Sequence, residues 1–205
     1  MHIAISGNIG SGKTTLTEKL AKHLNFEAEY ESVENNPYLA DFYEDMDRWA
    51  FHLQIYFLNS RINQVKRIQK TSHSVVQDRT IYEDAHIFAK NLYLSGHINE
   101  RDYQNYQGIF DSMIDFVTPP DLLIYLRADI PKLIERIQKR ARQYEVDMHP
   151  DYLKSLNIHY EDWIGQYDLG KLLIVDVNNL DFVEKEEDFS FIVEKVDVKL
   201  YGLLS

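Results

Sequence analysis

The residues best suited to chemistry form a glycine-rich loop near the start of the chain, Gly7-Asn8-Ile9-Gly10-Ser11-Gly12-Lys13-Thr14. The loop lies between a short apolar run, Ile3–Ile5, and a segment with helical spacing, which is the strand–GxxxxGK[ST]–helix pattern of a P-loop. The backbone N–H groups of such a loop and the positive end of the following helix cradle phosphate oxygens. Lys13 can reach the β- and γ-phosphates, and the Thr14 hydroxyl can hold Mg²⁺. We therefore expect the loop and the adjacent Thr15 to bind a nucleoside triphosphate with Mg²⁺.

Polar residues also end two other runs that the sequence predicts to be strands. Asp78 and Arg79 follow one of these runs, and Glu31 ends the other. Ligands of open parallel sheets lie beyond the carboxyl ends of the strands, so we expect these residues to meet the P-loop in one cleft. There Asp78 could bind Mg²⁺, and Arg79 could hold a substrate hydroxyl or the phosphate in transfer. The alternative for Asp78 and Arg79 is an ordinary surface pair.

Two polar side chains interrupt an aromatic-rich segment whose spacing predicts one helix, Tyr43–Thr71. Gln54 and Arg61 are seven residues apart, which places them on nearly one face and about 10 Å apart along the axis. If they are buried, both need partners, and an amide with donor and acceptor atoms suits the edge of a nucleobase. The alternative is that both face water or cap loops.

A cationic cluster stands out in this acidic chain, at Arg136, Arg140 and Arg142. Arg136 and Arg140 share one helix face, and arginine forks match phosphate oxygens. We expect the cluster to neutralise charge that spreads over a phosphate during transfer. The alternative is a solubilising helix face.

The elements that must position these residues alternate along the chain. The predicted strands are five short apolar or β-branched runs: His2–Ser6, Glu27–Glu31, Ser74–Asp78, Leu122–Leu126 and Leu172–Asp176. The predicted helices are Lys13–Leu24, Tyr43–Thr71, Tyr82–Leu94, Glu100–Phe116, Ile130–Tyr144 and Pro150–Gln166. This alternation predicts an α/β fold with a parallel sheet covered on both faces. We expect Asp181–Asp188 to be a solvated acidic loop, and Phe189–Leu200 is compatible with either helix or strand.

Composition narrows the class of protein. The 205 residues suffice for one α/β domain, and 44% hydrophobic residues argue against disorder. The chain has no cysteine, which excludes disulfides and thiolate zinc sites and agrees with a cytoplasmic location. We expect neither a membrane span nor a signal peptide. The net charge of −11 would repel a nucleic-acid polymer, but it would not repel a small neutral acceptor.

Five motifs in unbroken order resemble the deoxynucleoside kinase family, from Met1 to about Gly165. The motifs are Gly7–Thr15, Glu31-Ser32-Val33, Trp49–Arg61, Asp78–Asp84 and Arg136–Tyr152. The resemblance implies a P-loop NTPase three-layer fold, with a five-stranded parallel sheet flanked by helices. It further implies a single domain over residues 1–205, an arginine-rich lid at about 136–149, and a homodimer formed through helices such as Tyr43–Thr71 and Tyr82–Leu94.

The resemblance also implies roles for individual residues. Glu31 matches the family's general base, which takes the proton of the 5′-hydroxyl, and Arg79 matches the arginine near the 5′-oxygen. With Lys13, these two residues form the expected catalytic set, and Thr14 and Asp78 are the expected Mg²⁺ contacts.

Further matches concern the substrates. Tyr43 and Glu145 match the pair that binds the sugar 3′-hydroxyl, and Phe88 matches the aromatic residue that stacks on the base. The expected polar contacts to the base are Gln54, Arg61 and Asp84. The expected lid over the phosphates carries Arg136, Arg140 and Arg142.

The implied activity is ATP-dependent phosphorylation of a deoxynucleoside at its 5′-hydroxyl, in nucleotide salvage. In the family, the Arg–Asp pair goes with purine deoxynucleosides or deoxycytidine, so we expect deoxyadenosine first, then deoxyguanosine and deoxycytidine. A nucleoside monophosphate kinase is the alternative, although it should carry additional cations in its acceptor site. A nucleotide-dependent switch would show a guanine-selective NKxD motif, and Asn178-Asn179-Leu180-Asp181 lacks the lysine.

Overall fold

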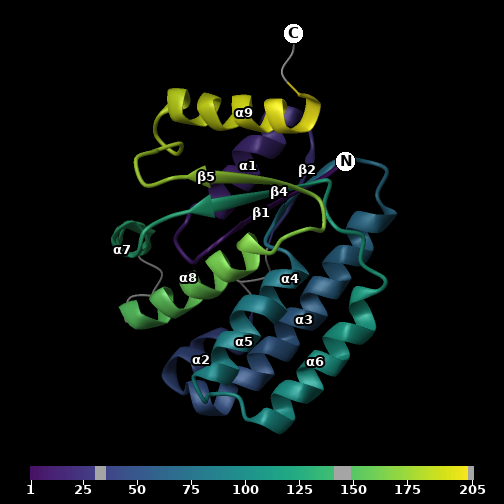
Figure 1. Ribbon diagram of the computed structural model, residues 1–205, viewed down its shortest axis with the longest axis vertical. Coiled ribbons are helices and arrows are strands. Elements are labelled where there is room, and N and C mark those ends of the chain that lie inside the picture. The colour runs from purple at the N-terminus through teal and green to yellow at the C-terminus, as the bar shows by residue number, and fades with distance from the viewer. Residues whose placement is uncertain (31–35, 141–148, 203–205) are drawn as a thin grey trace.

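The computed structural model describes residues 1–30, 36–140 and 149–202, in which strands and helices alternate (Figure 1). The strands are β1 (His2–Gly7), β2 (Glu27–Glu29), β3 (Val75–Asp78), β4 (Leu122–Arg127) and β5 (Lys171–Asp176). The helices are α1 (Lys13–Leu24), α2 (Leu39–Glu44), α3 (Met46–Lys70), α4 (Ile81–Glu83), the π-helix η1 (Asp84–Ala89), α5 (Lys90–Leu94), α6 (Glu100–Ile114), α7 (Ile130–Arg140), α8 (Pro150–Gly165) and α9 (Glu186–Tyr201). No helix within these described ranges combines the length and the apolar character needed to cross a membrane.

The five strands form one parallel sheet in the order β2-β3-β1-β4-β5, which confirms the predicted sheet. The register pairs Ile5 of β1 with Asp78 of β3, and Gly7 with Leu126 of β4. The loop after β1 and the segment after β3 therefore leave the sheet side by side. Carboxyl strand ends of this kind are where open parallel sheets bind ligands.

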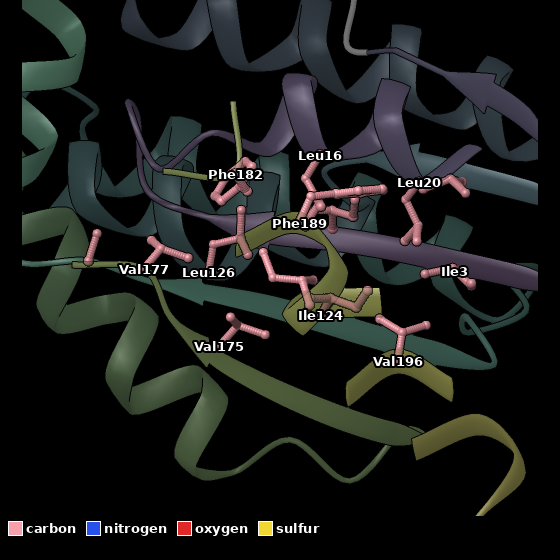
Figure 2. Close-up of a cluster of buried hydrophobic side chains, with 14 of the residues drawn as sticks. Ile3, Leu16, Leu20, Ile124, Leu126, Val175, Val177, Phe182, Phe189 and Val196 are labelled. Atoms are coloured by element: carbon pink, nitrogen blue, oxygen red, sulfur yellow. The ribbon is translucent and has the colours of Figure 1, made fainter. Parts of the chain in front are cut away.

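Side chains of the central strands alternate between two cores, as the two-residue period of a strand requires. Ile3, Ile5 and Ile124 pack with α1 and α9 in the cluster shown in Figure 2. On the other face, Ala4, Leu123 and Tyr125 pack with η1 and α8. The sheet is thus covered on both faces, with α9 along one side and α8 along the other (Figure 1).

A block of helices lies beside the sheet and is formed by α2, α3, α5 and α6 (Figure 1). One apolar cluster joins α3 to α4, η1 and α6, and it contains Leu58, Ile62, Ile81, Tyr106 and Phe110. A second cluster joins α2 to α3 and α5, and it contains Leu39, Phe42, Ala50, Leu53 and Leu92. The first cluster fixes α3 against η1, so polar residues on these helices are held in place near the sheet.

The single helix predicted over Tyr43–Thr71 is wrong at its start. The chain forms α2 and α3 there, and Asp45 separates them with a non-helical backbone (φ −145°, ψ 85°). The Asp45 carboxylate accepts a hydrogen bond from the backbone N–H of Arg48 at 3.2 Å, so it caps α3. Apolar spacing continues across this aspartate, which is why periodicity alone merged the two helices.

The helix predicted over Tyr82–Leu94 is also more complex than expected. It consists of α4, η1 and α5, and the middle part is a π-helix. The π-helix carries both Asp84 and Phe88. Wider helical turns of this type often occur at functional sites, because they re-aim side chains relative to a regular helix.

Near the C-terminus, the structure corrects one expectation and resolves another that was left open. The solvated loop predicted over Asp181–Asp188 is wrong in part, since Phe182 is buried and α9 begins at Glu186. The ambiguous segment Phe189–Leu200 is helical and lies within α9. Acidic residues in the first turn of α9 favour a helix start there, because they complement the positive end of the helix dipole.

Candidate active site

The loop after β1 has the tight turns that only glycine permits. Gly10 and Gly12 have φ values of 85° and 100°. A Cβ atom at Gly12 would lie 2.6 Å from Cζ of Phe182, and one at Gly10 would lie 2.8 Å from the carbonyl oxygen of Leu133. The backbone is therefore free to curl into a phosphate-binding loop while α7 and the segment after β5 pack closely around it.

Side chains of the P-loop hold its shape and leave the helix start open. The Lys13 ammonium is buried and donates to the carbonyl oxygen of Asn8 at 3.1 Å. The Asn8 amide donates to the carbonyl oxygen of Leu153 at 3.0 Å and to Asn157 Oδ1 at 3.1 Å, which ties the loop to α8. The first turn of α1 has no acidic residue and Gly12 offers no side-chain cap, so this positive helix end suits an anion.

Thr14 and Asp78, the expected Mg²⁺ contacts, lie together. The Thr14 hydroxyl donates to Asp78 Oδ2 at 2.6 Å. Asp78 Oδ1 is buried and has no hydrogen-bond partner among the described residues. Two hard oxygen ligands with one unused lone-pair site fit Mg²⁺, which takes few protein ligands and completes its shell with water and phosphate. The described residues contain no cluster of three or more acidic, histidine or cysteine side chains that could hold a metal.

Arg79 is fixed through both its backbone and its side chain. Its φ of 65° is left-handed, an unusual conformation for an arginine, and its N–H donates to the carbonyl oxygen of Ile5 at 2.9 Å. Its Nη1 donates to the Tyr160 hydroxyl at 3.1 Å, and its guanidinium carbon lies 4.3 Å from the centre of the Phe88 ring. The charge is thus held close to the end of β1, where the P-loop begins.

Arg136 lies beside the P-loop and contacts its backbone. Its guanidinium donates to the carbonyl oxygen of Ser11 at 2.9 Å, and to those of Val177 at 3.0 Å and Leu180 at 2.9 Å. Burial lowers the pKa of Arg136 from its ordinary value. The side chain therefore ties α7 to the P-loop and to the segment after β5, in addition to the lid role expected for it.

A cavity of about 360 Å³ lies between the P-loop, α7 and the segment after β5. Gly10, Gly12 and Lys13–Thr15 form one side of it, and Leu180–Glu184 form another. Its described lining contains more cations than acids, and the cations are Lys13, Lys132, Arg136, Lys139 and Arg140. This position and charge suit a nucleotide whose phosphates reach into the P-loop.

Gln54 and Arg61 are both buried, so the alternative that they face water is wrong. Arg61 Nε donates to Asp84 Oδ2 at 3.0 Å, and each of these two side chains is only 3% exposed. Arg61 Nη1 also donates to the carbonyl oxygens of Asp78 at 3.1 Å and Arg79 at 2.9 Å. Gln54 Oε1 is buried with no hydrogen-bond partner in the described part of the chain. Such an acceptor is expected to meet a donor from a ligand or a water molecule.

Sequence reasoning missed Gln64 and Gln77, which support Arg61. Gln64 Oε1 accepts from Arg61 Nη1 at 2.8 Å and from Gln77 Nε2 at 2.9 Å. Gln64 Nε2 donates to the carbonyl oxygen of Tyr30 at 3.1 Å, immediately before Glu31 in the sequence. The three-residue spacing from Arg61 to Gln64 on one helix was the available signal.

Sequence reasoning also missed Glu83 and Tyr160. The Glu83 carboxylate is fully buried and accepts from the Thr80 N–H at 2.8 Å, the Tyr160 hydroxyl at 3.0 Å and the Gly7 N–H at 3.5 Å. The Thr80-x-x-Glu83 spacing is a capping-box pattern and was a usable signal for a structural role of Glu83. Nothing in the sequence pattern pointed to Tyr160.

The remaining expected substrate contacts divide into two groups. Phe88 is half-buried on η1 beside Arg79, and Tyr43 is half-buried on α2 rather than on the long helix that was predicted to carry it. Glu31, Arg142 and Glu145 lie outside the described residues.

A P-loop next to an acidic strand end, with a buried polar site on the adjoining helices, defines a P-loop phosphotransferase. The family model for deoxynucleoside kinases matches residues 3–200. A deoxyadenosine kinase of Dictyostelium discoideum is 43% identical over 91% of this chain and 75% of its own length. A deoxyadenosine/deoxycytidine kinase of Bacillus subtilis is 39% identical over 95% of this chain and 90% of its own length.

Comparison of the fold with solved structures also indicates deoxynucleoside kinases. A solved structure of deoxyadenosine kinase from M. mycoides, with the products dCMP and dCDP bound, superposes with a TM-score of 0.86 at 33% identity, covering 96% of this chain and 99% of that one. The chain therefore belongs to the deoxynucleoside kinase family, and it is a kinase.

Proposed function

We propose that this chain transfers the γ-phosphoryl group of ATP to the 5′-hydroxyl of a deoxynucleoside. The observation that carries the proposal is the position of Arg61. It pairs with Asp84 on the acceptor side and donates to the carbonyl oxygens of Asp78 and Arg79, the two residues that meet the P-loop. One two-residue segment thus joins the buried polar cluster of α3 and η1 to the phosphate loop, as a direct transfer between two bound ligands requires.

In the proposed reaction the 5′-oxygen bonds to the γ-phosphorus, and the bond from that phosphorus to the bridging oxygen breaks, leaving ADP with the electron pair. The P-loop N–H groups and Lys13 hold the donor phosphates. Arg79 stabilises charge on the group in transfer, and Glu31 accepts the proton of the hydroxyl. Thr14 and Asp78 would hold Mg²⁺, which when bound neutralises phosphate charge.

Deoxyadenosine is the proposed preferred acceptor, followed by deoxyguanosine and deoxycytidine. Gln54 Oε1 offers an acceptor for an exocyclic amine, and the buried Arg61–Asp84 pair supplies further polar groups on the same side. Relatives named as deoxyadenosine, deoxyadenosine/deoxycytidine and deoxyguanosine kinases support these three acceptors as a group. We further propose Phe88 as the ring that stacks on the base, and Tyr43 with Glu145 as the contacts to the 3′-hydroxyl.

Rates with the four deoxynucleosides and their 5′-monophosphates test the proposal. A nucleoside monophosphate kinase would prefer the monophosphates. The buried polar cluster instead favours an uncharged acceptor, because Arg61 is already paired with the Asp84 carboxylate. We expect deoxyadenosine to give the highest kcat/KM and monophosphates to give little turnover. Preference for a monophosphate would contradict the reaction, and preference for thymidine would contradict the base assignment.

We also propose that the chain acts as a single domain with a lid at residues 136–149, and that it works as a cytoplasmic homodimer. Size-exclusion chromatography with light scattering tests the assembly. A mass near twice 24.2 kDa is expected, and a monomer at working concentration would contradict it.

A further inference from the structure

We propose that Tyr160 is a positioning residue for Arg79, and that its hydroxyl, held by the Glu83 carboxylate, aims the guanidinium at the phosphoryl group in transfer. This inference rests on the proposed function of Arg79. The three groups form one chain: Arg79 Nη1 donates to the Tyr160 hydroxyl at 3.1 Å, and that hydroxyl donates to Glu83 Oε1 at 3.0 Å.

The groups at the two ends determine which atom donates and which accepts in each of these two hydrogen bonds. A guanidinium only donates hydrogen bonds, and a carboxylate only accepts them. The Tyr160 hydroxyl must therefore turn its proton toward Glu83 and its lone pair toward Arg79. Burial raises the pKa of Tyr160 well above its ordinary value, so the hydroxyl keeps the proton that this arrangement needs.

Glu83 is anchored independently of Tyr160. Its Oε2 accepts from the N–H of Thr80 at 2.8 Å and from the Thr80 hydroxyl at 3.2 Å, while its Oε1 also receives the N–H of Gly7 at 3.5 Å. Gly7 is the first residue of the P-loop. The same carboxylate thus touches the phosphate loop at one side and orients the Tyr160 hydroxyl at the other.

The ring of Tyr160 is equally constrained. It is fully buried on α8, stacks on the Tyr125 ring with centroids 5.8 Å apart, and meets the Phe88 ring edge-on at 6.5 Å. Phe88 lies against Arg79 in turn. Because the Tyr160 ring is confined on these sides, its hydroxyl is held in one position. A fixed hydroxyl of this kind can orient the flexible Arg79 side chain.

The hydroxyl also keeps two opposite charges apart. Glu83 and Arg79 are both buried, and two such groups would otherwise attract each other strongly at close range. Direct pairing would turn the guanidinium toward Glu83 and away from the phosphate. A neutral hydroxyl between them gives each of the two charges a hydrogen-bond partner, and it directs the guanidinium through the contact at Nη1.

The test is Tyr160→Phe, which removes only the hydroxyl. We expect kcat to fall about tenfold while KM for ATP and for the deoxynucleoside stays within about twofold, because an interaction that acts in the transition state lowers kcat alone. Tyr125→Phe is the matched control. It removes the hydroxyl of the ring stacked on Tyr160, where the partner is Glu161 on the surface side of α8, and it should retain nearly full kcat.

A double-mutant cycle separates positioning from general support of the fold. If Tyr160 acts through Arg79, Tyr160→Phe should change kcat by less than about twofold in an Arg79→Met background. An equal loss in both backgrounds, a rise in KM without loss of kcat, or a variant indistinguishable from wild type overturns the inference. Should Tyr160→Phe not fold, Glu83→Gln is compared in the same two backgrounds.

Failure of the proposed function gives a different result. In that case the unmodified protein does not phosphorylate any deoxynucleoside, which overturns the role of Tyr160 together with the proposed reaction. If the unmodified protein is active and only the comparison fails, the reaction stands and the role of Tyr160 does not.

Discussion

The amide of Gln54 is the residue through which base choice is most directly testable. Its Oε1 is buried without a hydrogen-bond partner in the described residues. We expect Gln54→Leu to lower kcat/KM for deoxyadenosine at least about tenfold, since a lost hydrogen bond to a buried ligand group is worth about 1–3 kcal/mol. KM for ATP should stay unchanged. Steady-state kinetics with all four deoxynucleosides measure the effect.

Gln69→Leu provides the control for that change, because Gln69 is an exposed glutamine on the same helix. Its kinetics should match those of the unmodified protein. An unaltered order of preference in Gln54→Leu would place the amide outside the acceptor site.

The carboxylate of Asp78 tests the metal contact. Asp78→Asn keeps the shape of the side chain but removes its charge, and Oδ1 is the atom that has no protein partner in the described residues. We expect kcat to fall about 100-fold or more and the Mg²⁺ concentration for half-maximal rate to rise. Titration with MgCl₂ at fixed ATP measures both.

Asp121→Asn serves as the comparison for Asp78, since Asp121 lies just before β4, at the opposite end of the strands. It should leave the Mg²⁺ requirement unchanged. A Mg²⁺ dependence of Asp78→Asn equal to that of the unmodified protein would contradict the assignment.

The positions of the candidate site residues were predictable from sequence where the residue types determine the chemistry. The P-loop pattern and the pair Asp78–Arg79 indicated phosphate and metal contacts, and the structure brings Thr14 to Asp78 as that interpretation required. Supporting residues were not predictable, because their role depends on partners distant in the sequence. Tyr160 is 81 residues from Arg79, and no local spacing connects them.

Among the elements, the start of α3 is determined by one side chain. Asp45 accepts from the Arg48 N–H and separates α3 from α2. We expect Asp45→Ala to lower the free energy of unfolding by about 1 kcal/mol, the usual effect of losing an N-cap. Urea denaturation followed by circular dichroism measures this loss.

Asp45→Asn is the control for the capping role, because an asparagine side chain also caps helices well. It should recover most of the lost stability. Equal destabilisation by both substitutions would show that the charge of Asp45, rather than its cap, matters.

Whether a segment forms a strand or a helix was easier to predict than where a helix breaks or changes its type. The strand–helix alternation and the sheet edge followed from apolar runs and their period. The π-helix η1 did not, since its wider turns depend on packing against α3, α6 and α8. The α2–α3 break was missed for a related reason: apolar residues on both sides of Asp45 belong to one cluster, and this hides the change of direction.

At the scale of the whole molecule, nucleotide binding should be coupled to stability. The cavity beside the P-loop joins α1, α7 and the segment after β5, so a nucleotide bound there would connect distant parts of the chain. At a ligand concentration 100 times its Kd, the free energy of unfolding should rise by about 2.7 kcal/mol. We expect Mg²⁺-ATP to raise the thermal midpoint by about 5–10 °C.

Differential scanning fluorimetry measures this shift, and Lys13→Met is the matched variant. Lys13 lies in the P-loop and lines the cavity beside it. The variant should lose most of the shift with Mg²⁺-ATP while keeping the shift with a deoxynucleoside. Equal shifts with Mg²⁺-ATP in both proteins would show that the P-loop lysine does not contribute to nucleotide binding.

The contact between Phe182 and Gly12 limits how the chain can be shortened. Phe182 follows β5, more than 160 residues after the P-loop, yet its ring packs against Gly12, the residue just before α1, and lies near Arg136. A fragment that stopped at β5 would retain every residue of the nucleotide-binding signature and still lack one wall of the pocket. Enzymes made by splitting or grafting this kinase therefore need the C-terminal segment to be supplied, either in the same polypeptide or as a complementing peptide.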